Sequence, residues 1–261
     1  MTAIREKIID WARVYVPQFN AWAALKNMDF YTQSPLNGID SKVKGMIVGI
    51  NPGCGGVWRG RDKTVEEFLG GNPTWNERFG ADNQPAGGWR RYLVGVHTFM
   101  NVPKERCPDG IDDDCQYVWT NVTPFSTRKA NEIPADLIPV SVQSMLELIS
   151  ILSPERIMLL GANSYRYFER YAAHHQQERD IYFRSAFAHG ANIHIGRIHG
   201  VPCYCIVHPT GHWPVSHNFT TEVLTLLREI DTVRNGRAVN DVGAVIARLN
   251  SDVTIQKLIN R

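Results

Sequence analysis

The sequence predicts an α/β fold, a three-layer α/β/α sandwich with a central, mainly parallel four-stranded sheet. Three observations predict it. Short apolar runs typical of buried strands recur along the chain, helical patterns lie between them, and 261 residues suffice to bury a substantial core. Buried strands that alternate with helices imply right-handed crossovers and a sheet covered on both faces.

Four short apolar runs are the predicted strands of the sheet core, at 46–50, 117–120, 157–160 and 202–207. The first is closed by Pro52-Gly53, as expected where a buried strand leaves the sheet. His199-Gly200 separates the last run from 193–198 and predicts a hairpin-like turn.

The predicted helices begin with residues 3–15, where Ile4, Ile8, Trp11 and Tyr15 have helical spacing, and we expect Pro17 to end this helix. Thr64 and Glu67 form a capping-box pattern that opens a small helix. Further helices are predicted around 89–100, over 137–152 with Pro139 in the first turn, over 163–171 and over 218–233. We expect residues 1–233 to form one domain and 234–261 an appended helical tail.

Composition excludes several classes of protein. The hydrophobic share of 43% is too high for a disordered chain, and 21 Gly with 14 Pro are too few for a fibrous one. No run of about 18 apolar residues predicts a membrane span, and the N-terminus does not resemble a signal peptide. The net charge of +2 neither requires nor excludes a nucleic-acid partner.

Cysteine and histidine spacing does not predict a metal site. None of the five cysteines forms a C-x-x-C pattern, so we expect reduced thiols in a cytoplasmic protein. His208, His212 and His217 could suggest zinc, but Pro209 and Pro214 prevent the continuous helix that would place ligands on one face.

The ends of the predicted strands are the most informative part of the sequence. In parallel sheets, ligands bind outside the carboxyl ends of the strands. The segments that fall there are 49–53 (GINPG), 120–121, 161–163 and 208–211. Asn51, Asn121, a histidine and glycine-rich turns are therefore expected to line one crevice.

These segments resemble the uracil-DNA glycosylase superfamily. GINPG at 49–53 resembles the first active-site motif of its mismatch-specific (thymine/uracil) and SMUG-type branches, and HPTGHWPVS at 208–216 resembles the second motif. WTNV at 119–122 stands where the family places a base-reading asparagine, and LLGANS at 159–164 resembles its third core strand. The resemblance spans about residues 44–230 in order, with identity confined to these motifs.

The resemblance implies a division of roles in hydrolysis of an N-glycosidic bond. Asn51 would hold the attacking water, because a carboxamide positions water but accepts no proton at neutral pH. His208 would donate to pyrimidine O2 as negative charge develops there, and Asn121 would read the O4/N3 edge of the flipped base. No lysine in the motifs could form a Schiff base, so a monofunctional enzyme is expected.

The resemblance also suggests which residues contact the base and the duplex. Phe79 is the first candidate to stack on the base, with Phe68 and Trp58 as rivals. His212 and Trp213 follow the second motif, where the family inserts a wedge into the duplex. Further cations near strand ends could contact phosphates: Arg59, Arg61, Arg90, Arg91, Arg128 and Lys129.

The base itself is left open by the sequence. Uracil-specific members place a tyrosine just after the first-motif proline, where it collides with a 5-substituent, whereas Gly53 follows Pro52 in this chain. Uracil or a 5-modified pyrimidine, including a modified cytosine such as phage DNA carries, is therefore expected, in DNA repair or phage defence. DNA is the expected partner of a monomer that does not bind a membrane.

Two other classes of function remain open. One is a non-catalytic nucleic-acid-binding relative of the same fold. The other is a nucleotide-processing α/β enzyme, which is disfavoured because the chain has neither G-x-G-x-x-G nor a Walker lysine.

Overall fold

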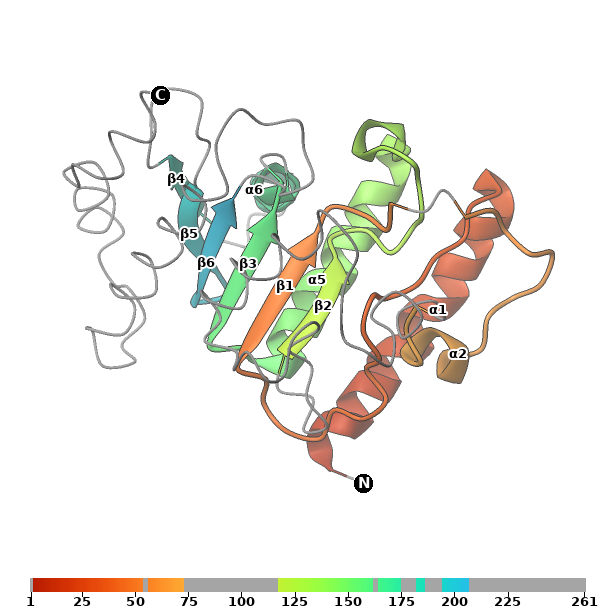
Figure 1. The fold of residues 1–261 in the computed structure, drawn as a ribbon, viewed down its shortest axis with the longest axis horizontal. Helices are drawn as coiled ribbons and strands as arrows, with labels where there is room; N and C mark the ends of the chain where they lie inside the picture. Colours follow the sequence, from red (N-terminus) through yellow and green to blue (C-terminus); the bar gives the residue numbers. More distant parts are fainter. Residues whose placement is uncertain are drawn as a thin grey trace, which may run out of the picture.

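The computed structural model describes residues 2–53, 56–72, 117–161, 164–174, 182–185 and 194–206. They form a mixed α/β fold around a six-stranded sheet with the order β2-β1-β3-β6-β5-β4 (Figure 1). The strands are β1 Gly45–Gly49, β2 Tyr117–Asn121, β3 Arg156–Leu160, β4 Tyr182–Ser185, β5 His194–Ile198 and β6 Val201–Ile206. The helices are α1 Ala3–Lys26, α2 Val65–Leu69, α5 Ile138–Leu152 and α6 Ser164–His174, with 3₁₀ turns at Ala130–Glu132 and Ala135–Leu137.

The four predicted core strands are confirmed as the parallel part of the sheet. β1 pairs in parallel with both β2 and β3, and β3 pairs in parallel with β6. β5 and β6 form the predicted hairpin, with His199 and Gly200 at φ 49° and 75° in its turn. β4 then pairs antiparallel with β5. The predicted count of four strands is therefore not confirmed, because the antiparallel addition raises it to six within the described residues.

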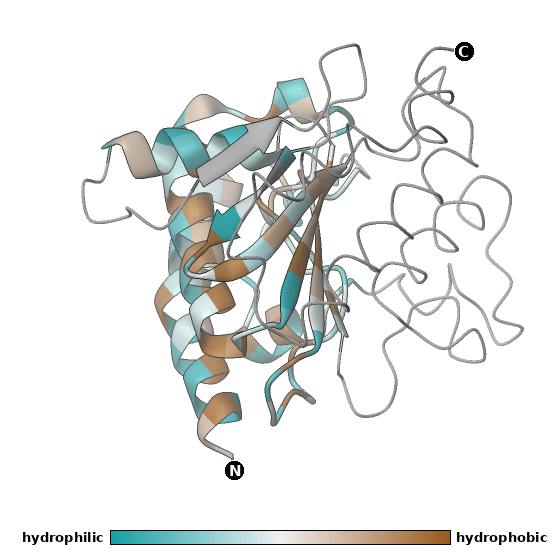
Figure 2. Ribbon diagram, turned by 90° about the vertical axis from the view of Figure 1, so that its left-hand side faces the viewer, coloured by the Kyte–Doolittle hydropathy of each residue, from teal (hydrophilic) through white to brown (hydrophobic). Residues whose placement is uncertain are grey.

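The described helices gather on one side of the sheet (Figure 2). α5 packs against both α1 and α6, and the core between them and the sheet takes alternate strand residues, among them Met46, Val48, Ile157 and Leu159. The intervening side chains point to the other face and are also buried, with Ile47 and Met158 no more than 1% exposed. Burial on both faces is typical of a parallel sheet that has layers on each side.

Helix α1 is longer than the sequence predicted. Pro17 lies inside it, and the expectation that Pro17 ends the helix is wrong. An internal proline costs about 3 kcal/mol through the lost hydrogen bond and ring clash. Here the second half of the helix buries Phe19 and Ala23 in the same core as Trp11, and this burial offsets the proline.

The other described helices match their predictions. Thr64 and Glu67 make both hydrogen bonds of the capping box at α2. α5 has its proline in the first turn, and α6 begins at Ser164. The predicted helices around 89–100 and 218–233, the tail 234–261 and the domain boundary lie outside the described residues.

The outer edge of β2 is occupied by a single serine. Ser34 donates its backbone N–H and its hydroxyl to the carbonyl of Trp119, each at 3.0 Å, and Trp119 N–H lies 3.0 Å from Ser34 Oγ. Both residues are buried. The segment before α2 therefore takes the place that another strand would have at this position.

One described segment, Ala135–Leu152, is long and apolar enough to cross a membrane, with a mean hydropathy of 1.5, although the sequence inspection predicted no such run. Half of it is buried inside the protein. Its apolar side chains, such as Leu146 and Ile149, belong to the core shared with α1 and the sheet.

Candidate active site

The chain segments that leave β1 and β2 run side by side beyond the sheet. Val122 N–H donates to Gly49 O at 2.8 Å, and Thr123 N–H donates to Ile50 O at 3.0 Å. Further out, Thr127 N–H donates to Pro52 O at 3.2 Å. The predicted convergence of the Asn51 and Asn121 segments at one edge of the sheet is thus confirmed.

Asn51 is half-buried, and its carboxamide nitrogen is held by three oxygens. Nδ2 lies 2.6 Å from the hydroxyl of Thr127, 3.2 Å from the Thr127 carbonyl and 3.1 Å from the Pro52 carbonyl. Within the described residues no group donates to its Oδ1. An acceptor oxygen is therefore left to hold a water molecule or a substrate group.

Asn121 ends β2 with a side chain that is buried yet incompletely bonded. The residue is 6% exposed, and its buried Nδ2 has no hydrogen-bond partner among the described groups. Asn121 lies directly across from Gly49 in the register of the two strands. A Cβ at Gly49 would be 2.5 Å from Asn121 Oδ1, so the glycine makes room for this carboxamide. A buried donor without a partner suits recognition of a ligand that brings an acceptor.

Gly53, predicted to leave space beside the base, is exposed, and a Cβ at this position would meet no described atom within 4 Å.

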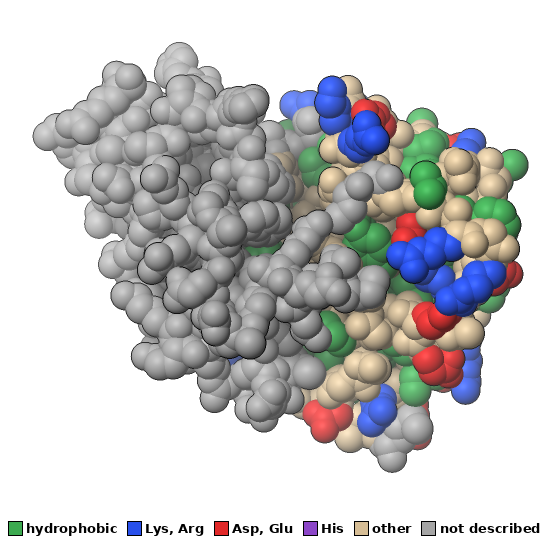
Figure 3. Space-filling model, turned by 45° about the vertical axis from the view of Figure 1, so that its right-hand side comes forward, with side chains coloured by type: hydrophobic (Ala, Val, Ile, Leu, Met, Phe, Trp, Pro, Cys, Tyr) green, Lys and Arg blue, Asp and Glu red, His purple; other side chains and the backbone are tan. Residues whose placement is uncertain are grey.

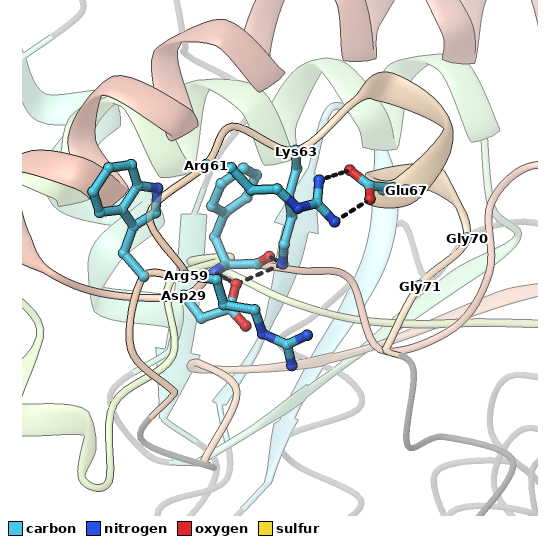
Figure 4. A pocket seen from close by; sticks show the side chains of 9 residues that line it. Asp29, Arg59, Arg61, Lys63, Glu67, Gly70 and Gly71 are labelled. Atoms are coloured by element: carbon cyan, nitrogen blue, oxygen red, sulfur yellow. Dashed lines mark hydrogen bonds and ion pairs between the residues drawn. The ribbon is translucent and has the colours of Figure 1, made fainter.

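The predicted phosphate contacts Arg59 and Arg61 line a cavity of about 290 Å³ together with Asp29, Trp58, Lys63 and Glu67, among others (Figure 4). Arg61 is already engaged, because its two terminal nitrogens contact the Glu67 carboxylate at 3.0 and 2.6 Å. This pair, together with the Thr64 backbone N–H, lowers the pKa of Glu67 to about 2. The Arg59 guanidinium points away from this pair and from the Lys63–Asp29 ion pair of the same cavity. Arg59 is therefore better placed than Arg61 to bind an anion.

A second ion pair connects this cavity to the Asn51 segment. Lys63 contacts Asp29 Oδ1 at 2.5 Å and donates to the Phe30 carbonyl. Asp29 N–H donates to Gly56 O at 2.9 Å, and Ser126 N–H donates to Asp29 O at 2.8 Å. Ser126 is the chain neighbour of Thr127, which holds Asn51, so the cavity and Asn51 are tied to the same short segment.

The two rival stacking aromatics have different surroundings. Phe68 is 1% exposed and packs between Trp11, Phe19 and Phe30, with ring centroids 5.7–5.8 Å apart, so it is a core residue and not a platform for a base. Trp58 is partly buried against that core and lines the cavity, and its buried Nε1 has no partner among the described groups.

The other predicted site residues, His208, Phe79, His212 and Trp213, lie outside the described residues. Among the residues that are described, no three His, Cys, Asp or Glu side chains gather where they could hold a metal ion.

Sequence inspection did not single out Thr127 or Asp29, although both contact the segments that carry the site. Thr127 stands in an ordinary polar stretch after β2. Only the pairing of that stretch with residues 51–52 brings its hydroxyl to Asn51.

No family model matches the chain, and no curated protein matches it.

Proposed function

We propose that this chain is a monofunctional DNA glycosylase that extrudes uracil or a 5-modified pyrimidine and hydrolyses its N-glycosidic bond, leaving an abasic site. The observation that carries the proposal is the pair of asparagines at adjacent strand ends. Among the described residues, one has an acceptor oxygen to which no group donates, and the other is buried with a donor that has no partner. A glycosylase needs both functions, one on the water and one on the base.

Asn51 would act on the nucleophile. Its Oδ1 accepts a hydrogen bond from the water and directs a lone pair of the water oxygen toward the anomeric carbon. The sugar passes through an oxocarbenium-like state as the C–N bond breaks, and water adds to the same carbon. The proton that this water loses passes to solvent, and the departing base anion takes one up. The departing base carries the electron pair of that bond, and His208 donates to its O2 in this proposal.

Asn121 would select the base. Its Nδ2 donates to O4 of uracil while Oδ1 accepts from N3–H, and with the carboxamide turned over, the same group serves the N4/N3 edge of cytosine. The free space at Gly53 supports acceptance of a 5-substituent, including that of a modified cytosine in phage DNA.

The architecture expected of such an enzyme is the three-layer sandwich. The burial of both faces of the parallel strands supports it. The protein would act as a cytoplasmic monomer on DNA, without a membrane, metal or cofactor.

The test measures base release by mass spectrometry from duplexes that carry uracil, mismatched thymine or a 5-substituted cytosine, with chelator present. Release of at least one base is expected, with large losses in Asn51→Ala and His208→Ala and none in Asn37→Ala, an exposed asparagine. An abasic-site yield unchanged from wild type in both active-site variants would overturn the mechanism. DNA binding without release from any duplex would favour a non-catalytic binding protein.

A second arm tests the open space beside Pro52. Gly53→Tyr is expected to abolish release of 5-substituted bases while keeping release of uracil. Wild-type protein that releases uracil and no 5-substituted base would exclude this part of the proposal.

A further inference from the structure

The carboxamide of Asn51 is fixed by Thr127. The hydroxyl oxygen of Thr127 lies 2.6 Å from Asn51 Nδ2 and 2.7 Å from the carbonyl of Lys129. A hydroxyl has one proton to donate, and the Lys129 carbonyl can only accept. The hydroxyl therefore donates to Lys129 O and must accept from Asn51.

This donor count decides which way the carboxamide faces. With Nδ2 toward Thr127, both amide protons find acceptors in the hydroxyl and the carbonyls of Thr127 and Pro52. Turned over, Oδ1 would face three oxygens, of which none has a proton left for it. The reversed orientation would therefore set acceptor against acceptor and leave the amide nitrogen unbonded.

Thr127 is itself held in place. It is 6% exposed, and its backbone N–H donates to Pro52 O at 3.2 Å. The hydroxyl is thus carried by a backbone segment that is bonded to the segment bearing Asn51. A group held in this way can fix a neighbour's orientation without touching the substrate.

We infer that Thr127 is a positioning residue that holds Asn51 with its acceptor oxygen toward the attacking water. The inference rests on the proposed function. Without the hydroxyl, Nδ2 keeps only its longer contacts to the Thr127 and Pro52 carbonyls, so the carboxamide is held less firmly. It then turns more readily to present its NH₂ group, which cannot accept a hydrogen bond from the water. The rate of base release should fall while affinity for DNA is kept, because the Thr127 hydroxyl is buried and engaged by Asn51 and Lys129.

The experiment compares Thr127→Val, which keeps the shape of the side chain without its hydroxyl, with Thr127→Ser, which keeps the hydroxyl. Single-turnover base release is expected to fall about 10- to 100-fold in Thr127→Val, as for other misoriented catalytic groups, and to stay within about twofold in Thr127→Ser. The Kd for duplex DNA should stay within about twofold in both, since only orientation changes. Thr32→Val is the matched control, because it removes another buried hydroxyl that donates to a carbonyl, at 2.9 Å.

A second readout is independent of activity. Hydrogen exchange of the Asn51 side-chain amide, followed by NMR in the full chain and assigned with Asn51→Ala, should be slow in wild type and Thr127→Ser and faster in Thr127→Val. Unchanged exchange in folded Thr127→Val would overturn the inference. A normal rate of base release in that variant would overturn it too. If wild type releases no base from any duplex, the proposed function fails, and the positioning role in catalysis fails with it. Active wild type with a normal Thr127→Val variant refutes the positioning role alone.

Discussion

At the scale of single residues, the candidate site requires a residue without a side chain at Gly49 as well as the carboxamide of Asn121. The Asn121 carboxamide occupies the space that any side chain at Gly49 would need. Sequence inspection took Gly49 as part of a turn motif, whereas its structural role is to admit a side chain from the neighbouring strand.

Gly49→Ala is expected to push the Asn121 carboxamide aside, because a Cβ would lie 2.5 Å from its Oδ1. Overpacking of this kind destabilises proteins by about 1–3 kcal/mol, and base release should fall with it. Urea unfolding and the base-release assay measure the two effects. Gly53→Ala is the control for the unfolding measurement, since its Cβ would meet no described atom within 4 Å. Equal behaviour of the two variants would contradict the packing argument.

Asn121→Ala should separate stability from activity. A buried amide donor without a partner costs about 1–3 kcal/mol, so its removal is expected to leave the free energy of unfolding unchanged or to raise it. Base release should nevertheless be lost, because the contact to the base edge is gone. A marked loss of stability in this variant would show that the carboxamide serves the fold rather than a ligand.

His194 is a buried titratable residue away from the site. It is 9% exposed and stacks on Tyr165 with ring centroids 3.9 Å apart. Burial, and to a smaller extent the Arg166 guanidinium, lower its pKa from 6.5 to about 4. Between these two values the unfolded chain binds a proton that the folded chain does not, so stability rises with pH across this window.

His194→Phe keeps a ring against Tyr165 and removes the titration. Wild type is expected to lose at most about 3 kcal/mol more than this variant as pH falls from about 7 to about 4, at about 1.4 kcal/mol per unit of pKa. Urea unfolding at several pH values measures the difference. Parallel pH profiles of the two proteins would show that His194 does not titrate in this way.

At the scale of elements, α1 is attached to α5 by polar contacts as well as by apolar packing. Trp11 Nε1 donates to the Ser144 carbonyl at 2.9 Å, and the Tyr15 hydroxyl donates to Glu147 Oε1 at 2.5 Å. Burial first, and then the Glu147 carboxylate, raise the pKa of Tyr15, so its hydroxyl keeps the proton that it donates.

Tyr15→Phe is expected to lower the free energy of unfolding by about 1 kcal/mol, the usual net value of one such hydrogen bond. Glu147→Gln retains an acceptor oxygen and should lose less. Thermal and urea unfolding of both variants test this, and a Tyr15→Phe protein as stable as wild type would show that the contact adds nothing to the docking of α1.

The helices and strands also show which features of the fold can be predicted from sequence patterns. The strands were predictable because buried parallel strands are short apolar runs, and the α2 cap because Thr64 and Glu67 are three residues apart. The continuation of α1 past Pro17 was not predictable, because packing of Phe19 and Ala23 on distant residues decides it. Likewise, Asn51 was identifiable from its motif, but Thr127 lies 76 residues away and only the fold brings them together.

At the scale of the whole molecule, a net charge of +2 means that any contact with DNA depends on a local cluster of cations rather than on the field of the whole protein. On the face drawn in Figure 3, the described Lys and Arg side chains lie in separate groups, with acidic side chains among them. At the cavity, Arg61 and Lys63 are paired with carboxylates, while Arg59 points away from both pairs.

A plot of the logarithm of the association constant for duplex DNA against the logarithm of salt concentration is therefore expected to have a shallow slope. Arg59→Ala should reduce the slope by about one phosphate contact, and Arg61→Ala by less, because Arg61 is bound to Glu67. Arg13→Ala on α1, where Arg13 pairs with Asp10, is the control and should have no effect. An equal loss of slope in all three variants would indicate a diffuse field instead of a local contact.

The serine at the edge of β2 has a consequence for the behaviour of the protein in concentrated solution. An unpaired strand edge offers N–H and C=O groups to a second molecule, and such edges seed aggregation. Ser34 forms hydrogen bonds with both the N–H and the C=O of Trp119. Gly71, at φ 79°, lies close to the Ser34 backbone, because a Cβ at Gly71 would be only 2.8 Å from the Ser34 carbonyl carbon. Ser34 therefore prevents a strand of a second molecule from pairing with the middle of β2. A single small residue in this way helps to keep the sheet from extending between molecules.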